Sequence, residues 1–118
     1  FIESFENLDF DRFQTFFSTD VTVFFPPSAK INYRVEGKKN AMKVFKDFFV
    51  KVKQGKSNPP YLDISPKKLK MTLIQDVAIV TFELEDIDAI SRRTIVFRRE
   101  NGKFLIFHLH ASKMENHK

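Results

Sequence analysis

Two histidines, His108 and His110, have the residue type and spacing in this chain that best suit chemistry. In an extended strand they lie on one face, because successive side chains point to opposite sides. Imidazoles bind metals and act as general bases near neutral pH. A metal site needs a third ligand, which the sequence does not supply at a fixed spacing. We therefore expect a hydrogen-bonded pair beside Arg98 and Ser112, with no metal ion and no cofactor.

The bulk composition limits the remaining kinds of chemistry. The chain has 118 residues, which is enough for one domain with a core of its own. It has no cysteine, which excludes disulfides, thiolate chemistry and cysteine-bound zinc. No apolar run approaches the roughly 18 residues of a membrane span, so we expect no membrane partner. Phe1 begins in a helical pattern without a methionine, so we expect a processed or trimmed product. Its compartment stays open between the cytoplasm and export after loss of a signal peptide.

The basic segment from Lys38 to Lys70 contains ten lysines and no arginine. Nucleic-acid binding needs cationic contacts to phosphate, usually together with exposed aromatic side chains. Here the aromatic residues alternate with lysines in a way that places the aromatic side chains in the core and the lysines on the surface. The pattern favours a solvated helix face, and we expect no nucleic-acid partner.

The stretch from Ser91 to Ser112 organises the predicted fold, because Asn101-Gly102 between two apolar runs is a strong hairpin signal. Two registers are possible: a two-residue turn pairs Arg99 with Phe104, whereas a three-residue loop pairs Arg99 with Lys103. We expect the three-residue loop because it keeps the apolar residues in phase. One face then carries Ile95, Phe97, Leu105, Phe107, Leu109 and Ala111. The opposite face carries Arg98, Phe104, Ile106, His108 and His110.

The other elements follow from periodicity and from turn residues. Helices are expected over residues 1–8, 10–17 and 38–52, with Asp9 as the N-cap of the second. Strands are expected over residues 21–25, 31–36, 69–73 and 77–84, with a turn at 18–20 and a frayed tail at 113–118. Helices, short strands, a helix and then longer strands indicate one α+β domain over residues 1–118.

Several segments match a known family. They are Asp20-Val-Thr-Val-Phe-Phe-Pro after two helices, Gly37 opening the amphipathic helix, and Asp76-Val-Ala-Ile-Val-Thr-Phe. The most specific is the closing strand, Arg98-Arg-Glu-Asn-Gly-Lys-Phe-Leu-Ile-Phe-His-Leu-His-Ala-Ser112. The chain resembles the SnoaL-like branch of the nuclear transport factor 2-like superfamily, and among its members the hub domains of calcium/calmodulin-dependent kinases. This resemblance implies a cone-shaped half-barrel, in which a strongly curved mixed or antiparallel sheet wraps around N-terminal helices.

The resemblance also implies a pocket inside the cone and a dimer through its outer face. The ligand-binding residues expected for a small apolar molecule are Phe13, Phe17, Phe45, Phe49, Val80, Phe82, Ile95, Phe97, Phe107 and Leu109, with Tyr33 or Arg93 orienting a polar end. The homodimer interface is expected at Arg98, Phe104, Ile106, His108 and His110. The alternative is that the phenylalanines fill the cone and leave no cavity.

Family isomerases and cyclases imply a second alternative, an enzyme with a carboxylate in the pocket and a tyrosine as oxyanion donor. Asp63 is the one acid near a tyrosine, Tyr61, and the prolines on either side indicate a loop at the rim. We therefore expect no catalytic residue and favour a ligand-binding domain. The alternatives stay open as an enzyme of the isomerase, cyclase or dehydratase type and a homo-oligomeric interaction scaffold with a filled cone.

Overall fold

The computed structural model describes residues 1–54, 65–85 and 89–115. In chain order its elements are α1 (Ile2–Glu6), α2 (Phe10–Gln14), β1 (Phe17–Phe24), a 3-10 turn at Pro27–Ala29, β2 (Val35–Glu36), α3 (Lys38–Gln54), β3 (Lys67–Ile74), β4 (Val77–Glu85), β5 (Ala89–Glu100) and β6 (Lys103–Glu115). The strands form one curved, unclosed sheet in the order β2-β1-β6-β5-β4-β3, in which β1 and β6 are parallel. The α+β class and this curved sheet confirm the predicted fold.

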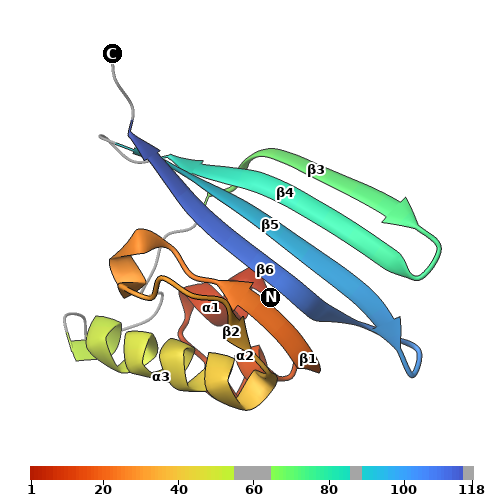
Figure 1. Ribbon diagram of the computed structural model, residues 1–118, viewed down its shortest axis with the longest axis horizontal. Helices are drawn as coiled ribbons and strands as arrows, with labels where there is room; N and C mark the ends of the chain where they lie inside the picture. The colour runs from red at the N-terminus through yellow and green to blue at the C-terminus, as the bar shows by residue number, and fades with distance from the viewer. Residues whose placement is uncertain (55–64, 86–88, 116–118) are drawn as a thin grey trace.

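The helices cover only one half of the sheet (Figure 1). α3 packs against β1 and β2, and the short helices α1 and α2 pack beside it. Within the described residues, no helix makes more than a marginal contact with β3, β4 or β5. The β3–β4 hairpin therefore extends beyond the helical layer: the apolar side chains of β3 are exposed, whereas Ala78 and Phe82 on β4 are still buried.

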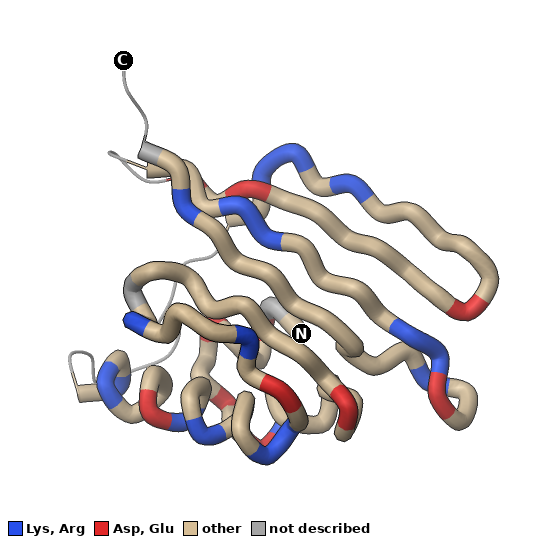
Figure 2. The backbone as a smooth tube through the Cα atoms, in the orientation of Figure 1, with Lys and Arg blue, Asp and Glu red and all other residues tan. Residues whose placement is uncertain are grey.

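Local sequence signals explain where the helices lie. The Asp9 carboxylate accepts a hydrogen bond from the Arg12 amide at 3.3 Å, which confirms the predicted N-cap of α2. α3 buries Ala41, Met42, Phe45 and Phe49, whereas its lysines are exposed apart from the half-buried Lys38. Figure 2 marks the lysine positions along the helix. No helix in the described part of the chain combines the length and apolar character needed to span a bilayer.

Several predicted boundaries differ from the structure. α2 ends at Gln14, and residues 18–20, expected as a turn, belong to β1. The strand before α3 is shorter than expected, and β6 continues through residue 115, so the predicted tail at 113–118 begins too early. The longer β6 adds pairing with β5, from Ser91 with Lys113 to Ala89 with Glu115. Residues 18–20 lie in the irregular stretch of β1 between the pairs Phe17–Ile106 and Thr22–His108, so the strand runs through the expected turn as a bulge.

The main hairpin has a two-residue turn, so the predicted three-residue loop is wrong. Arg99 pairs with Phe104, and Asn101 and Gly102 adopt φ angles of 52° and 80° between the strands. A turn with positive φ at both central residues matches the right-handed twist of the flanking strands. This register alone would place Leu105 and Phe107 on the outer face of the sheet and Ile106 on the inner face.

A β-bulge at Phe107 restores the expected phase beyond it. Phe97 pairs with Ile106, whereas the neighbouring Val96 pairs with His108, so Phe107 has no partner of its own on β5. Leu109 and Ala111 therefore face inward as predicted, opposite Ile95 and Arg93. The predicted faces of Phe104, Leu105, Ile106 and Phe107 are wrong, because those residues lie between the turn and the bulge.

The core lies between the helices and the inner face of β1, β6 and β5. Its fully buried side chains include Leu8, Phe13, Val21, Val23 and Ile106, each 0% exposed. Ile106 contacts this core and its amide donates to the Phe16 carbonyl at 2.7 Å. Its predicted place at a dimer interface is therefore wrong.

Candidate functional site

The edge strand β3 carries apolar side chains that are exposed on the concave face of the sheet. Met71 and Leu73 on β3 lie opposite Val80 and Ala78 on β4, so they share the inner face of the sheet. Leu69, Met71 and Leu73 are 62%, 69% and 63% exposed. A contiguous exposed apolar surface of this kind marks an interaction or ligand-binding site in most soluble proteins.

The inner faces of the neighbouring strands extend this surface toward the core. Val80 on β4 lies opposite Ile95 on β5, which lies opposite Leu109 on β6. Ala78 lies opposite Phe97 in the next row. Both rows begin with an exposed residue on β3 and end with a buried one on β6; between them Val80 and Phe97 are half-buried, and Ala78 and Ile95 are buried. We call this surface the concave patch: Leu69, Met71, Leu73, Ala78, Val80, Phe82, Ile95 and Phe97.

The phenylalanines predicted to enter a pocket from the helices instead pack closely together. Phe13, Phe17, Phe45 and Phe49 are no more than 8% exposed. The Phe13 ring lies 4.9 Å from the Phe17 and Phe45 rings and 5.1 Å from the Phe49 ring, centroid to centroid. Such spacing is typical of aromatic core packing. These four rings leave little surface for a ligand at the helical end of the sheet.

Arg93 lies on the concave face and is partly buried. It is directly opposite Phe82 on β4 and Ala111 on β6. Its side chain forms no hydrogen bond or ion pair with any described residue. Burial lowers the pKa of the Arg93 guanidinium from its ordinary value, because desolvation disfavours the charged form.

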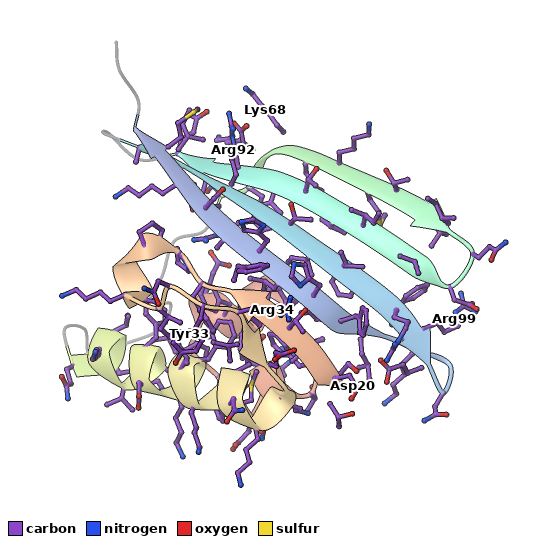
Figure 3. The ribbon with its side chains drawn as sticks, viewed as in Figure 1. Asp20, Tyr33, Arg34, Lys68, Arg92 and Arg99 are labelled. Atoms are coloured by element: carbon purple, nitrogen blue, oxygen red, sulfur yellow. The ribbon has the colours of Figure 1, made fainter. Side chains whose placement is uncertain are left out.

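Tyr33 is the second residue predicted to orient a ligand, and it lies at the opposite side of the sheet from the strands around Arg93. It precedes β2 at one edge of the sheet, whereas the concave patch is nearest the other edge (Figure 3). Its side chain is 66% exposed. The structure does not bring Tyr33 and the patch together.

The outer face holds the two histidines. Thr22 Oγ1 lies 2.7 Å from His108 Nδ1, and the exposed Phe24 ring packs against both imidazoles at centroid distances of 5.7 and 5.2 Å. The pKa of His108 is lowered mainly by burial and next by the charge of His110, with a smaller contribution from Arg34. The hydrogen bond with Thr22 acts in the opposite direction and raises it. In the described residues, no group of three or more potential ligands is arranged to hold a metal ion.

Phe107 joins the outer face rather than the predicted pocket. The Arg98 guanidinium lies 4.1 Å from the centroid of the Phe107 ring and forms ion pairs with Asp20 and Glu100. At the hairpin tip, Phe104 turns inward and stacks under Arg99, with the guanidinium 4.9 Å from the ring centroid. Phe104 is thus also misplaced in the predicted interface.

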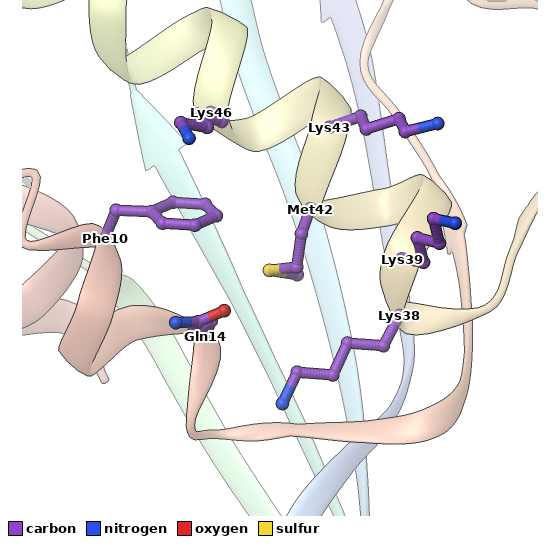
Figure 4. Close-up of a pocket in the computed structure, with 7 residues that line it drawn as sticks. All are labelled: Phe10, Gln14, Lys38, Lys39, Met42, Lys43 and Lys46. Carbon is purple, nitrogen blue, oxygen red and sulfur yellow. The ribbon is translucent and has the colours of Figure 1, made fainter.

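A shallow hollow of about 440 Å³ lies between α2 and α3, away from the sheet (Figure 4). Phe10 and Met42 form its floor, and its lining is completed by Gln14, Lys38, Lys39, Lys43 and Lys46. The Lys46 amine lies 5.9 Å from the Phe10 ring centroid, whereas Lys39 and Lys43 point away from the hollow. These side chains are consistent with the solvated helix face that the sequence predicts.

The predicted catalytic alternative has no support from the described residues. Tyr61 and Asp63 lie outside them. By the register, the described inner faces of β4, β5 and β6 carry one acid, Glu115 at the end of β6 opposite Ala89, and none lies among the residues of the concave patch. Glu83 and Glu85 of β4 alternate with the inner-face residues and lie on the outer face. Glu83 has Arg92 3.8 Å and Lys68 3.6 Å away at the same end of the sheet (Figure 3).

The model of the SnoaL-like domain family matches residues 1–115. The chain belongs to the SnoaL-like domain family. This membership confirms the resemblance found in the closing strand. No curated protein matches the chain in sequence.

Solved structures share the fold of this SnoaL-like domain. A putative ketosteroid isomerase from Parabacteroides distasonis is 23% identical, with a TM-score of 0.72 over 96% of this chain and 81% of that chain. A putative dehydratase of the NTF2-like family from Streptomyces avermitilis is 14% identical, with a TM-score of 0.73 over 95% and 86% of the two chains. The CamKII hub homology domain of Chlamydomonas reinhardtii is 18% identical, with a TM-score of 0.67 over 96% and 89%. At these identities the likeness shows the fold alone.

The sequence predicts a strand over residues 69–73, but the ligand site expected from it does not include the residues of that strand. Leu69, Met71 and Leu73 alternate with polar residues, which indicates a strand with one apolar face. That pattern normally means a face packed on a core. What it does not show is that β3 is an edge strand with no helix against it.

Proposed function

We propose that this SnoaL-like domain binds a small, largely apolar molecule on the concave patch. The observation that carries the proposal is the exposure of Leu69, Met71 and Leu73 beside the half-buried Val80 and Phe97. A ligand on this surface would gain about 25 cal/mol for each square ångström of apolar area removed from water. The patch has a buried side for anchoring and an open side for entry, as ligand sites usually do.

The strand residues therefore take the place of the helical phenylalanines in the proposal. Val80, Phe82, Ile95, Phe97 and Leu109 keep their predicted role as the inner wall. Phe13, Phe17, Phe45 and Phe49 belong to the core cluster that also contains Phe82, Ile95 and Leu109, and they fill the helical end of the concave face.

Native mass spectrometry of freshly purified protein is the first test. A bound molecule of a few hundred daltons that disappears on denaturation is the expected result. Calorimetric titration with a neutral probe, decanol below its solubility limit, then measures affinity directly. Saturable binding is expected, because decanol can lie along the patch without needing a polar partner at its far end.

Two variants of β3 locate the site. Met71→Lys introduces a charge on the concave face and should weaken decanol binding by about tenfold or more, because the ligand would desolvate the ammonium group. Thr72→Lys adds the same charge to the next residue of the same exposed strand, on the outer face, and should leave affinity within about twofold. Equal effects of the two variants, or no binding to the wild type, would refute the proposal.

We also propose that the outer face forms a homodimer. Phe24, at 38% exposure, is an exposed aromatic side chain beside His108, His110 and the Arg98–Phe107 pair. Aromatic residues and arginine are enriched where protein interfaces have their strongest contacts. Arg98, His108 and His110 keep their predicted interface role, and Phe107 replaces Ile106 and Phe104.

A further inference from the structure

We infer that the molecule bound on the concave patch is an amphiphile with an oxyanion head group, a carboxylate in the simplest case, held by Arg93. This inference rests on the proposed ligand-binding function and adds the chemical class of the ligand.

Arg93 is the exception among the six arginines of the chain. Each of the other five has a carboxylate oxygen within 4 Å: Arg12 with Glu3 at 3.6 Å, Arg34 with Glu36 at 3.4 Å, Arg92 with Glu83 at 3.8 Å, Arg98 with Glu100 at 3.0 Å and Arg99 with Asp76 at 3.7 Å. Their side chains are between 36% and 55% exposed. Arg93 is partly buried on the inner face and has no such partner among the described residues.

The surroundings of Arg93 make this unpaired charge costly. Its cross-strand neighbours are the apolar residues Phe82 and Ala111, which offer no hydrogen-bond acceptor from their side chains. A partly buried cation without a partner loses hydration and gains nothing in return. A ligand oxyanion would supply the missing charge, and the planar guanidinium matches the two oxygens of a carboxylate.

The position of Arg93 suits a head group at one end of an apolar body. It lies one inner-face position from Ile95 and two from Phe97 along β5. At the rise of a β-strand these positions are about 7 and 13 Å from Arg93. A medium-length aliphatic chain with its carboxylate at Arg93 therefore extends over the rows that contain Val80 with Met71 and Ala78 with Leu73.

Decanoate and decanol test the head group, because they share one apolar chain and differ in charge. Calorimetric titration of the wild type should give decanoate an affinity about tenfold or more above that of decanol. A hydrogen bond to a charged group typically raises affinity by about tenfold or more. The difference should shrink in high salt, which screens an accessible ion pair. Decyl phosphate, titrated in parallel, shows whether Arg93 selects a carboxylate or any oxyanion.

Three variants separate a head-group contact from a general charge effect. Arg93→Met should lower decanoate affinity about tenfold or more and leave decanol affinity unchanged or higher. Arg93→Lys keeps the charge without the planar fork and should give an intermediate loss. Arg92→Met is the matched control: it removes the same charge one residue away on the opposite face of the sheet, and should change decanoate affinity less than about twofold.

The folded stability of the variants provides a readout without ligand. Because Arg93 has no partner among the described residues, Arg93→Met should leave the unfolding midpoint unchanged or raise it, so loss of decanoate binding cannot be attributed to unfolding. Equal affinity for decanoate and decanol, or equal losses from Arg92→Met and Arg93→Met, would overturn the head-group inference and leave the proposed function standing. Binding of neither probe would instead refute the proposed function.

Discussion

At the scale of single residues, the environment of His108 makes folding sensitive to acid. Burial and the neighbouring charge of His110 lower the pKa of His108 in the folded state from its ordinary value of 6.5. The unfolded chain therefore binds a proton at a higher pH than the folded chain does. The stabilising contribution is complete above the unfolded-state pKa, and it is lost as the pH falls through the folded-state pKa.

We predict a free energy of unfolding that falls between about pH 8 and about pH 5 and depends on this imidazole. His108→Gln keeps a hydrogen-bonding partner for Thr22 but cannot take up a proton, so it should flatten this part of the profile. His110→Gln removes one contributor to the pKa shift and should reduce the slope only in part. Urea unfolding followed by circular dichroism measures both. A profile unchanged by His108→Gln would mean that other groups carry the acid sensitivity.

At the scale of elements, the bulge in β6 decides which of two adjacent apolar residues belongs to the core. Ile106 is 0% exposed, whereas the Phe107 ring lies on the outer face beneath the Arg98 guanidinium. The larger side chain is thus the less buried one. Side-chain volume alone would rank their contributions to stability in the wrong order.

Alanine substitutions should reveal this difference. Ile106→Ala leaves a cavity in the core and should lower the free energy of unfolding by about 2–5 kcal/mol. Phe107→Ala removes a partly exposed ring and one cation–π contact, and should cost about 1 kcal/mol. Chemical denaturation of both variants gives the comparison. A cost for Phe107→Ala equal to or above that for Ile106→Ala would argue that Phe107 points inward.

At the scale of the whole molecule, the sheet has two unlike faces. Helices cover the concave face at the β2–β1–β6 end and leave it open at the β3 end (Figure 1). The outer face carries the histidines, Phe24 and Phe107. A ligand on the concave patch and a second copy on the outer face would therefore not compete for the same surface.

We predict that Phe24→Asp weakens self-association, raising the dimer dissociation constant about tenfold or more, because it places a charge in the proposed interface. Phe48→Asp is a matched control, since Phe48 is 40% exposed on α3 and Phe24 is 38% exposed on the sheet. Sedimentation velocity over a range of concentrations distinguishes the two. A monomeric wild type, or equal effects of both changes, would contradict an outer-face dimer.

The sequence by itself determined the order of elements, the position of the main hairpin and the family. Turn residues such as Asn101-Gly102 and the cap at Asp9 act over a few residues, so their consequences can be read locally. Tertiary structure decided the register of β6. Residues 104–107 are all apolar, so the inner face would be apolar with either alternate pair of them pointing inward. Only contact with β1 selects Ile106 for the core.

The same limit applies to the candidate site. Arg92 and Arg93 are adjacent and chemically identical in the sequence. Arg92 pairs with Glu83 on the outer face, whereas Arg93 lies on the inner face between Phe82 and Ala111 and has no ion-pair partner in the part of the chain that the structure describes. Met71 and Leu73 follow an ordinary strand pattern, and only the absence of a helix against β3 in the described structure leaves them open. Which face is covered depends on residues distant in the chain, and local periodicity carries no information about them.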